Sequence, residues 1–399
     1  MDYEEFTKKY YIDRKNTKST KWDNMLNRFG RDDMVPMWIA DTDFSAPEEA
    51  VEAVKRRAEH GAYGYTITAL SYYQALQYWQ RSRHGLEIEQ DWIRFSPGCV
   101  AGIYWCIQAL TKENDAILVN TPVFYPFVLM PGNSKRTLVC NELINDNGKY
   151  SIDYEDFEAK IRDNDVKLYV LCSPHNPAGR VWKEEELERV LEICDRYHVI
   201  VIADEIHADF VFGDNKFIPA FNVAGGKYRE SMITITGPSK TFNLAGLKNS
   251  HLLIPSESYR KAYDDYMVYL HMDNGCLFGY EAAEAAYLHG AEYVDGLLQT
   301  VYKNYEYTYS AFKENLPNVV IPPLEGTYLS WFDLSPYIDP DDLQEVIQNR
   351  AGVALDYGKW YGEHFAGYIR LNLGTSLENV KKAVDAIIRE CINYIHEKG

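Results

Sequence analysis

Five short, almost unbroken apolar runs between residues 116 and 255 constrain the fold of this chain more than any other feature. They are "AILVN" (116–120), "VKLYVLC" (166–172), "VIVIAD" (199–204), "MITITG" (232–237) and "HLLIP" (251–255). Such runs are typical of strands in a sheet that is covered on both faces. Between the second and third runs, Leu187, Val190, Leu191 and Cys194 recur at helical spacing. A strand, a helix and a strand in succession predict an α/β fold with a parallel sheet.

The two ends of the chain predict a second, smaller α+β domain. "TYLSWFDL" and "GYIRLNLG" are predicted strands, and Ser376 can cap a following helix whose apolar stripe runs from Val380 to Ile395. A long helical connection is expected near residues 281–315. The first forty-odd residues lack a series of strands, so we expect them to pack on the smaller domain. The predicted division is a large domain over 46–288 and a small domain formed by 1–45 and 289–399.

Charge and cysteine content restrict the partners of the protein. Its net charge of −18 argues against binding to nucleic acid or to an anionic membrane surface. The seven cysteines are odd in number and scattered without a C-x-x-C pair, as in a reduced, cytosolic protein. The N-terminus lacks the apolar segment of a secretory signal, and no apolar run is long enough to cross a membrane. We therefore expect a cytoplasmic protein that acts on a small molecule.

Polar or aromatic residues follow each predicted strand. In open α/β sheets, ligands bind beyond the carboxyl ends of the strands. After "IRFS", the turn at Gly98, Cys99 and Val100 leads into a helix whose free N–H groups suit a phosphate. The ends of the other strands carry the aromatic loop of Phe124 and Tyr125, then Asn176, Asp204 and Lys240. Each feature is weak alone, but their convergence on one edge predicts a ligand site.

One cofactor, pyridoxal phosphate, accounts for this set of residues. It needs an amine for its Schiff base, which Lys240 offers, and a carboxylate to keep its ring nitrogen protonated, which Asp204 offers. Asn176 can donate to the phenolic oxygen, and the loop of Phe124 and Tyr125 gives the ring a flat face. The phosphate has the turn at Gly98–Val100. Lys248 can add a cation there, and Ser239 can either donate to the phosphate or cap the turn.

The motifs also resemble a known family. "SPHNPAGRVW", "DEIHADF" and "SKTFNLAGL" resemble the class I/II aminotransferase superfamily, fold type I of the pyridoxal-phosphate enzymes. "MWIADTDF", "GAYGYT", "TPVFYPF" and "DEIHAD" are similar to the cystathionine β-lyases of the MalY/PatB type, also called C–S lyases. The motifs run from residue 35 to 374. The resemblance implies a large domain with a mixed, mostly parallel sheet flanked by helices, plus a smaller α+β domain.

The resemblance also implies residue roles. Lys240, Asp204 and Asn176 keep the roles given above, and Arg370, in "YIRLN", would bind the α-carboxylate of the substrate. Tyr65 would reach the phosphate of the neighbouring subunit, which implies a homodimer with shared active sites. Members of this family commonly have tyrosine where Phe124 stands. Stacking survives that change, but a hydroxyl role is lost unless Tyr125 takes it.

The activity implied by the resemblance is α,β-elimination on L-cystathionine or related cysteine S-conjugates, which releases a thiol, pyruvate and ammonia. Lys240 would act as the general base after the substrate amine displaces it. An aminotransferase could use the same site, and a cofactor-binding regulatory protein without turnover is a third alternative. An aromatic pocket near Phe124, Tyr125 and Trp38 suits a thioether. The sequence shows no second arginine placed to bind a dicarboxylate.

Several of these residues have plainer interpretations. "DEIHAD" gathers four potential metal ligands, but neighbours on an extended segment point to opposite faces, so we expect no metal. His207 can lie beside Asp204 or simply in the core. Trp38 can line the substrate pocket or anchor the core. Arg370, taken alone, suits a structural ion pair, and Lys248 suits a solvated helix surface.

Overall fold

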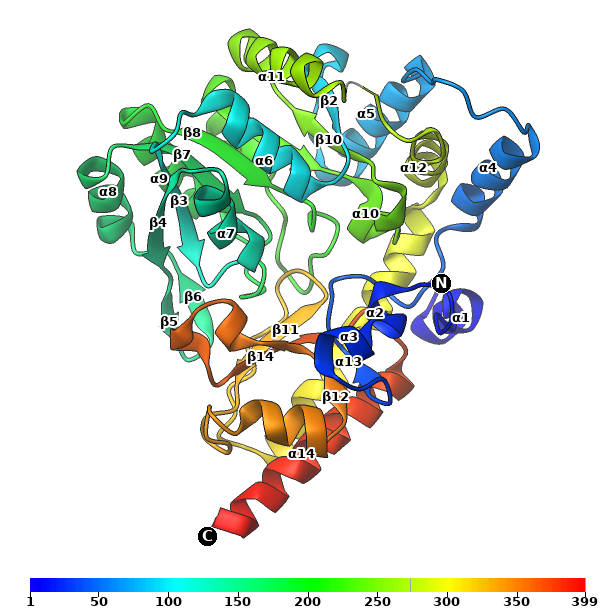
Figure 1. The fold of residues 1–399 in the computed structure, drawn as a ribbon, viewed down its shortest axis with the longest axis vertical. Coiled ribbons are helices and arrows are strands. Elements are labelled where there is room, and N and C mark those ends of the chain that lie inside the picture. The colour runs from blue at the N-terminus through cyan, green and yellow to red at the C-terminus, as the bar shows by residue number, and fades with distance from the viewer. Residues whose placement is uncertain (273, 399) are drawn as a thin grey trace.

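Seven strands form the central sheet of the computed structural model, which describes residues 1–272 and 274–398 (Figure 1). β10 is antiparallel to both of its neighbours, and every other neighbouring pair in this sheet is parallel. The predicted mixed, mostly parallel sheet is therefore confirmed. In spatial order, its strands are β2 (Ile93–Ser96), β10 (Ser250–Leu253), β9 (Met232–Thr236), β8 (Ile200–Asp204), β7 (Val166–Cys172), β3 (Ala116–Thr121) and β4 (Thr137–Glu142).

Both faces of this sheet are buried, which explains the unbroken apolar runs. In β7, Leu168 and Val170 join the hydrophobic cluster on one face. Tyr169 and Leu171, which alternate with them, join the cluster on the other face. Successive strand residues point to opposite faces, so a strand with two covered faces has no polar alternation.

Helices cover each face of the sheet. On one face, α6 packs against α11, and both contribute to the same hydrophobic cluster as α7. The other face carries α8, α9, α5 and α12, and α4 packs on α12. The bounds are α4 (Glu48–Glu59), α5 (Leu70–His84), α6 (Cys99–Leu110), α7 (Tyr125–Asn133), α8 (Tyr154–Asp163), α9 (Glu184–Arg196), α11 (Glu257–Leu270) and α12 (Leu277–His289).

A smaller antiparallel sheet lies below the central sheet in Figure 1. It has the order β11 (Leu329–Asp333), β14 (Tyr368–Asn372) and β13 (Asp356–Tyr357). Two long helices, α13 (Ala291–Asn315) and α14 (Leu377–Lys398), pack against each other beside it. Ser376 accepts a hydrogen bond of 3.3 Å from the backbone N–H of Asn379 at the start of α14, which is the predicted cap.

The N-terminal segment packs on this smaller part of the molecule. β1 (Val35–Pro36) pairs in parallel with β12 (Val353–Ala354). α1 (Tyr3–Tyr10) packs on α13, where the ring of Phe6 lies 5.2 Å from that of Tyr293. The two short helices that follow are α2 (Thr20–Asp23) and α3 (Met25–Phe29), and a separate hairpin joins β5 (Ile144–Asp146) to β6 (Lys149–Ser151).

The helices of the described chain are too short or too polar to span a bilayer. Over residues 1–272 and 274–398, none combines the length and the apolar character that crossing a membrane requires.

Candidate active site

The carboxyl ends of the central strands open into a cavity of about 520 Å³, which we call the strand-end cavity. Cys172 at the end of β7 is level with Asp204 at the end of β8, so both strands finish at the same edge. Lys240 reaches the cavity from the short helix α10 (Pro238–Thr241), which follows β9. The cavity is lined by these residues that the sequence singled out: Gly98, Cys99, Val100, Phe124, Asn176, Asp204, His207, Ser239, Lys240 and Lys248.

The wall at the start of α6 has the features of an anion site. Gly98 precedes the helix with a φ of 139°, a conformation that favours glycine, and no atom lies within 4 Å of the position of an added Cβ. No side chain caps the helix, so the first N–H groups of α6 are free to bind a ligand in the cavity. The helix dipole adds a positive potential there.

The amine of Lys240 has a defined partner. Its Nζ donates a hydrogen bond of 2.5 Å to the carbonyl oxygen of Ala40. The hydroxyl of Tyr328 donates to the same oxygen at 2.8 Å. Removal of the amine from water lowers the pKa of Lys240, and the nearby carboxylate of Asp41 opposes this shift. A lowered pKa favours the neutral amine, which is the form that can accept a proton.

Asp204 presents a buried carboxylate to the same cavity. One of its oxygens accepts a hydrogen bond of 3.1 Å from the N–H of Ile206. Burial raises the pKa of Asp204 to about 6, against the opposing effects of that hydrogen bond and of Lys240. A buried carboxylate of this kind needs a positively charged or protonated partner in the cavity.

The other acidic and imidazole groups of the "DEIHAD" segment point in different directions. Glu205 accepts a hydrogen bond of 2.7 Å from the N–H of Ala220, and Asp209 accepts one of 2.6 Å from the hydroxyl of Thr241. His207 lines the cavity, and burial lowers its pKa. Among residues 1–272 and 274–398, no three His, Cys, Asp or Glu side chains are grouped so that they could hold a metal ion.

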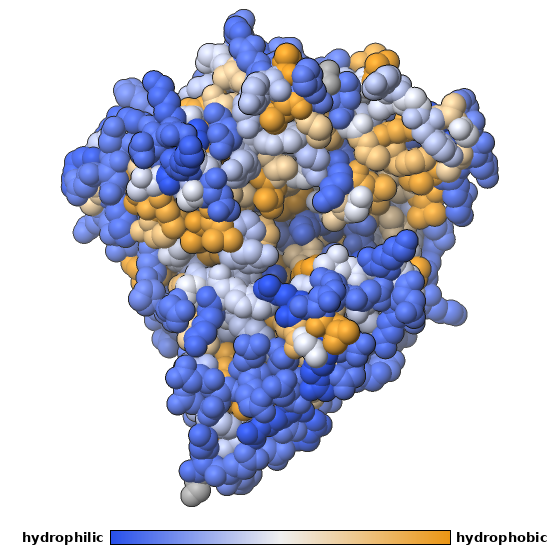
Figure 2. All heavy atoms as spheres, in the orientation of Figure 1, coloured by the Kyte–Doolittle hydropathy of each residue, from blue (hydrophilic) through white to orange (hydrophobic). Residues whose placement is uncertain are grey.

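A second cavity, of about 720 Å³, adjoins the first, and we call it the arginine cavity because Arg14, Arg28 and Arg370 line it. Figure 2 shows this face of the molecule hollowed between its upper and lower parts. Lys240 and Lys248 line both cavities. Lys240 therefore stands where the two spaces meet.

Arg370 lies on β14 and is buried. Its guanidinium forms an ion pair with Asp356, the residue opposite it on β13, and Nη1 donates a hydrogen bond of 3.0 Å to the side-chain oxygen of Asn176. Tyr361 donates to Asp356 at 3.3 Å. Arg370 is thus in a structural ion pair and also lines the arginine cavity, so the two interpretations of this residue are compatible.

Trp38 and Tyr125 also line the arginine cavity. Trp38 is 6% exposed, its Nε1 donates a hydrogen bond of 2.9 Å to the carbonyl oxygen of Lys21, and its ring lies 5.1 Å from that of Phe29. It is therefore both a core anchor and part of the cavity wall. Tyr65 differs from the other predicted site residues because it is fully exposed in this single chain.

One sequence-based statement is corrected by the structure. We expected no second arginine in a position to bind a dicarboxylate, yet Arg14 and Arg28 line the same cavity as Arg370. Both belong to the N-terminal segment, where the sequence has no strand pattern that would place them beside a residue near position 370. Sequence spacing gives no sign of this proximity.

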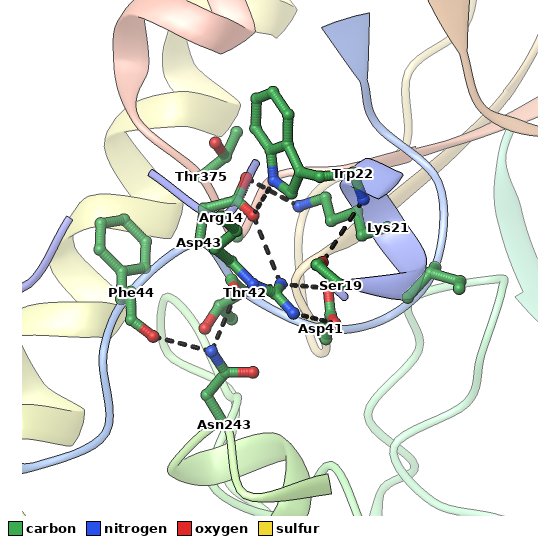
Figure 3. Close-up of polar contacts among 12 residues, drawn as sticks. Arg14, Ser19, Lys21, Trp22, Asp41, Thr42, Asp43, Phe44, Asn243 and Thr375 are labelled. Carbon is green, nitrogen blue, oxygen red and sulfur yellow. Dashed lines mark hydrogen bonds and ion pairs between the residues drawn. The ribbon is translucent and has the colours of Figure 1, made fainter. Parts of the chain in front are cut away.

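Figure 3 shows a buried network that holds the segment after Ala40 in place. Lys21 and Asp43, both fully buried, form an ion pair of 2.9 Å, and the indole N–H of Trp22 donates to Asp43 at 2.8 Å. Arg14 Nη2 donates a hydrogen bond of 2.9 Å to one carboxylate oxygen of Asp41, and its Nη1 lies 2.9 Å from the other oxygen as an ion pair. These pairs fix the segment that carries the acceptor of Lys240.

The same segment is tied to the loop that follows Lys240. The amide of Asn243 donates to the carbonyl oxygens of Thr42, at 2.9 Å, and Phe44, at 2.7 Å (Figure 3). Of the residues in "MWIADTDF", the sequence indicates a place in the site only for Trp38. The Ala40 carbonyl and the partners Asp356 and Asp43 were missed, since backbone acceptors and long-range ion pairs leave no local sequence signal.

Known proteins resemble this chain in sequence and in fold. The model of the family "Aminotransferase class I and II" matches residues 33–387. The cystathionine β-lyase PatB of Bacillus subtilis is 36% identical over 94% of this chain and 97% of its own length. Two solved structures are each 30% identical in sequence and cover 96% of this chain. Cystalysin of Treponema denticola, which contains pyridoxal 5′-phosphate, matches with a TM-score of 0.92 over 98% of its own chain. The pyridoxal-phosphate-bound C–S lyase of Staphylococcus hominis matches with a TM-score of 0.90 over 97% of its own chain.

Proposed function

This chain belongs to the class I and II aminotransferase family, and we propose that it is a pyridoxal-phosphate-dependent C–S lyase that acts on cysteine S-conjugates such as L-cystathionine. One observation carries the proposal beyond the family. Lys240 stands at the junction of two cavities, with the carboxylate of Asp204 in one and the guanidinium of Arg370 in the other. A cofactor in the strand-end cavity and an amino-acid substrate in the arginine cavity would therefore both contact the amine of Lys240.

The residues of the strand-end cavity suit pyridoxal phosphate. Its phosphate would lie at the uncapped start of α6, beside Gly98, Cys99 and Val100, with Ser239 and Lys248 as further donors. Asp204 would hold the proton on the ring nitrogen, and Phe124 would stack on the ring. His207 would lie close to Asp204. When bound, the cofactor supplies an electron sink that makes the Cα–H bond of the amino acid acidic.

The protein side chains would then position the substrate and move its proton. Arg370 would bind the α-carboxylate through a guanidinium that Asp356 already orients. Asn176, hydrogen-bonded to Arg370, would connect that carboxylate site with the cofactor site. Lys240, whose lowered pKa favours the neutral amine, would take the proton from Cα.

The remaining step is loss of the thiolate from Cβ. Phe124 has no hydroxyl, and its ring centre lies 5.5 Å from that of Tyr125. We therefore assign to the hydroxyl of Tyr125 the role of donating a hydrogen bond to the leaving sulfur. Trp38 would provide an apolar wall for the thioether, since it lines the arginine cavity.

Transamination is the competing activity, because the same residues can return the proton to the cofactor. The test is pyruvate release from L-cystathionine without any keto acid, compared with alanine–keto acid exchange on the same preparation. A lyase should release pyruvate faster than it exchanges. Exchange faster than release by about tenfold would assign the protein to the aminotransferases instead.

We also propose the assembly and organisation that the family resemblance implies. The exposed side chain of Tyr65 supports a homodimer in which this residue reaches the phosphate of the neighbouring subunit. The pairing of β1 with β12 supports a small domain built from 1–45 and 289–399 around a large domain of 46–288, with Gly399 itself outside the described residues. The absence of any disulfide among the seven cysteines favours the cytoplasm.

A further inference from the structure

The arginine cavity is strongly basic although the protein as a whole is acidic. Its basic lining residues are Arg14, Lys18, Arg28, Lys240, Lys248 and Arg370, whereas its carboxylates are Asp41 and Asp356. The chain carries a net charge of −18, so such a local excess of cations is not a consequence of composition. A cleft lined by one sign of charge concentrates ligands of the opposite sign.

Four of these cations either form an ion pair or lie beside the proposed cofactor site. Arg14 is paired with Asp41, and Arg370 is paired with Asp356. Lys240 and Lys248 also line the strand-end cavity, where the cofactor would bind.

Lys18 and Arg28 remain without a carboxylate partner. Within the described ranges, 1–272 and 274–398, neither has a carboxylate oxygen within 4.0 Å. Neither the proposed cofactor nor the α-carboxylate of the substrate accounts for these two charges.

Arg28 is better placed than Lys18 to bind an anion in the arginine cavity. It lies in the last turn of α3, and its guanidinium lies 4.2 Å from the ring centre of Trp360, which also lines the cavity. α3 is anchored by Phe29, whose ring packs edge-on against Trp38. A guanidinium that stacks on an aromatic face keeps the N–H groups at its edge available for a carboxylate.

We propose that Arg28, assisted by Lys18, binds an anionic group at the far end of the sulfur-linked substituent. The inference rests on the proposed lyase function and narrows its substrate class to cysteine S-conjugates that carry a remote carboxylate. L-cystathionine is one such compound. Arg370 and Arg28 would then bind the two ends of the substrate on either side of the bond to be broken.

A matched pair of substrates tests this inference. S-(2-carboxyethyl)-L-cysteine and S-propyl-L-cysteine have side chains of similar length, and only the first has a remote carboxylate. The wild-type enzyme should have the higher kcat/KM with the carboxyethyl conjugate. Arg28→Gln should lower that preference by about tenfold to a hundredfold, the usual effect of losing a hydrogen bond to a charged group. Its kcat/KM with the propyl conjugate should fall much less than that with the carboxyethyl conjugate, and Lys18→Gln should have a smaller effect in the same direction.

Lys15→Gln is the matched control. It removes one charge from the same N-terminal segment, but Lys15 lies over the ring of Trp22 and does not line the cavity. The control should keep the wild-type preference. A preference that Arg28→Gln leaves within about twofold of wild type overturns the inference.

The lyase proposal can fail separately. If the wild-type protein cleaves neither conjugate nor L-cystathionine, the proposed function is wrong. Calorimetric binding of the two conjugates to the wild type and to Arg28→Gln then decides the inference by itself. Stronger binding of the carboxyethyl conjugate that is lost in the variant supports Arg28 as the anion-binding residue, and equal binding rejects it.

Discussion

The amine of Lys240 donates a hydrogen bond to the carbonyl oxygen of Ala40, 200 positions earlier in the chain. This contact places the free amine at the junction of the two cavities rather than in bulk water. The acceptor is a backbone atom in a segment fixed by ion pairs, so its position does not depend on a side-chain rotamer.

Lys240→Ala should abolish lyase turnover and remove the covalent attachment of the cofactor. Sodium borohydride treatment of the wild-type protein with pyridoxal phosphate should attach the cofactor to Lys240, because reduction makes the bond between amine and cofactor permanent. Peptide mass spectrometry locates the modified residue. Modification of Lys248 instead, or wild-type turnover in the variant, would show that Lys240 is not the reactive lysine.

Asp204→Ala should weaken cofactor binding and slow proton abstraction, since the ring nitrogen loses its charged partner. Removing one member of a buried ion pair costs about 3–5 kcal/mol, which corresponds to a loss of affinity of about a hundredfold or more. Fluorescence titration with pyridoxal phosphate measures the affinity. Unchanged affinity and rate would reduce Asp204 to an ordinary carboxylate at a strand end.

The contribution of Glu205 to the stability of the cofactor-free protein should fall as the pH rises from about 4.5 to about 8. Burial raises the pKa of Glu205 from its ordinary value of 4.5 to about 8, so in this range the folded state holds a proton that the unfolded state has released. Asp204 acts in the same direction up to about pH 6.

Glu205→Gln isolates the contribution of Glu205, because its side-chain oxygen can still accept from the N–H of Ala220. The variant should be more stable than wild type at pH 8, on the order of 1–3 kcal/mol, and nearly equal to it at pH 4.5. Urea denaturation at both pH values measures the difference. A variant that is less stable at pH 8 would contradict the direction of the shift.

Lys21→Met should destabilise the protein by up to about 3–5 kcal/mol, since the buried carboxylate of Asp43 loses its ion-pair partner at 2.9 Å and keeps only Arg14, at 3.5 Å. The matched control is Lys261→Met, which breaks an exposed ion pair with Asp265 and should cost less than about 1 kcal/mol. Urea denaturation compares both variants with wild type. Equal effects would mean that the buried pair has no special role in holding the segment after Ala40.

Tyr65→Phe and Lys240→Ala should each be inactive alone but should partly restore activity when mixed. The reason is that Tyr65, fully exposed in one chain, is proposed to act at the site of the neighbouring subunit. A mixed dimer would contain one site with both native residues. The measurement is pyruvate release after joint refolding, and an active monomer in sedimentation would rule out shared sites.

The central sheet could be predicted from the sequence because its signal is local. Strands buried on both faces need apolar residues at every position, and β7 occupies the run at 166–172 that was predicted for it. The strand-end cavity was also foreseeable, since parallel strands end at a common edge and each is followed by a polar or aromatic residue.

The arginine cavity could not be predicted in the same way. Its wall combines residues 14–41 with residues near 356–370, and their proximity depends on the packing of the N-terminal segment against the smaller sheet. Arg28 is an exposed residue on a short helix, where an arginine is ordinary. Only the three-dimensional position of Trp360 and Arg370 gives this residue a candidate role.

The pairing of β1 with β12 has a consequence for the order of biosynthesis. A ribosome releases the β1 segment long before its partner, which lies at residues 353–354. The walls of the arginine cavity therefore come together only after Arg370 has been made. Chains that end before residue 370 can form much of the central sheet but lack the complete amino-acid site beside Lys240.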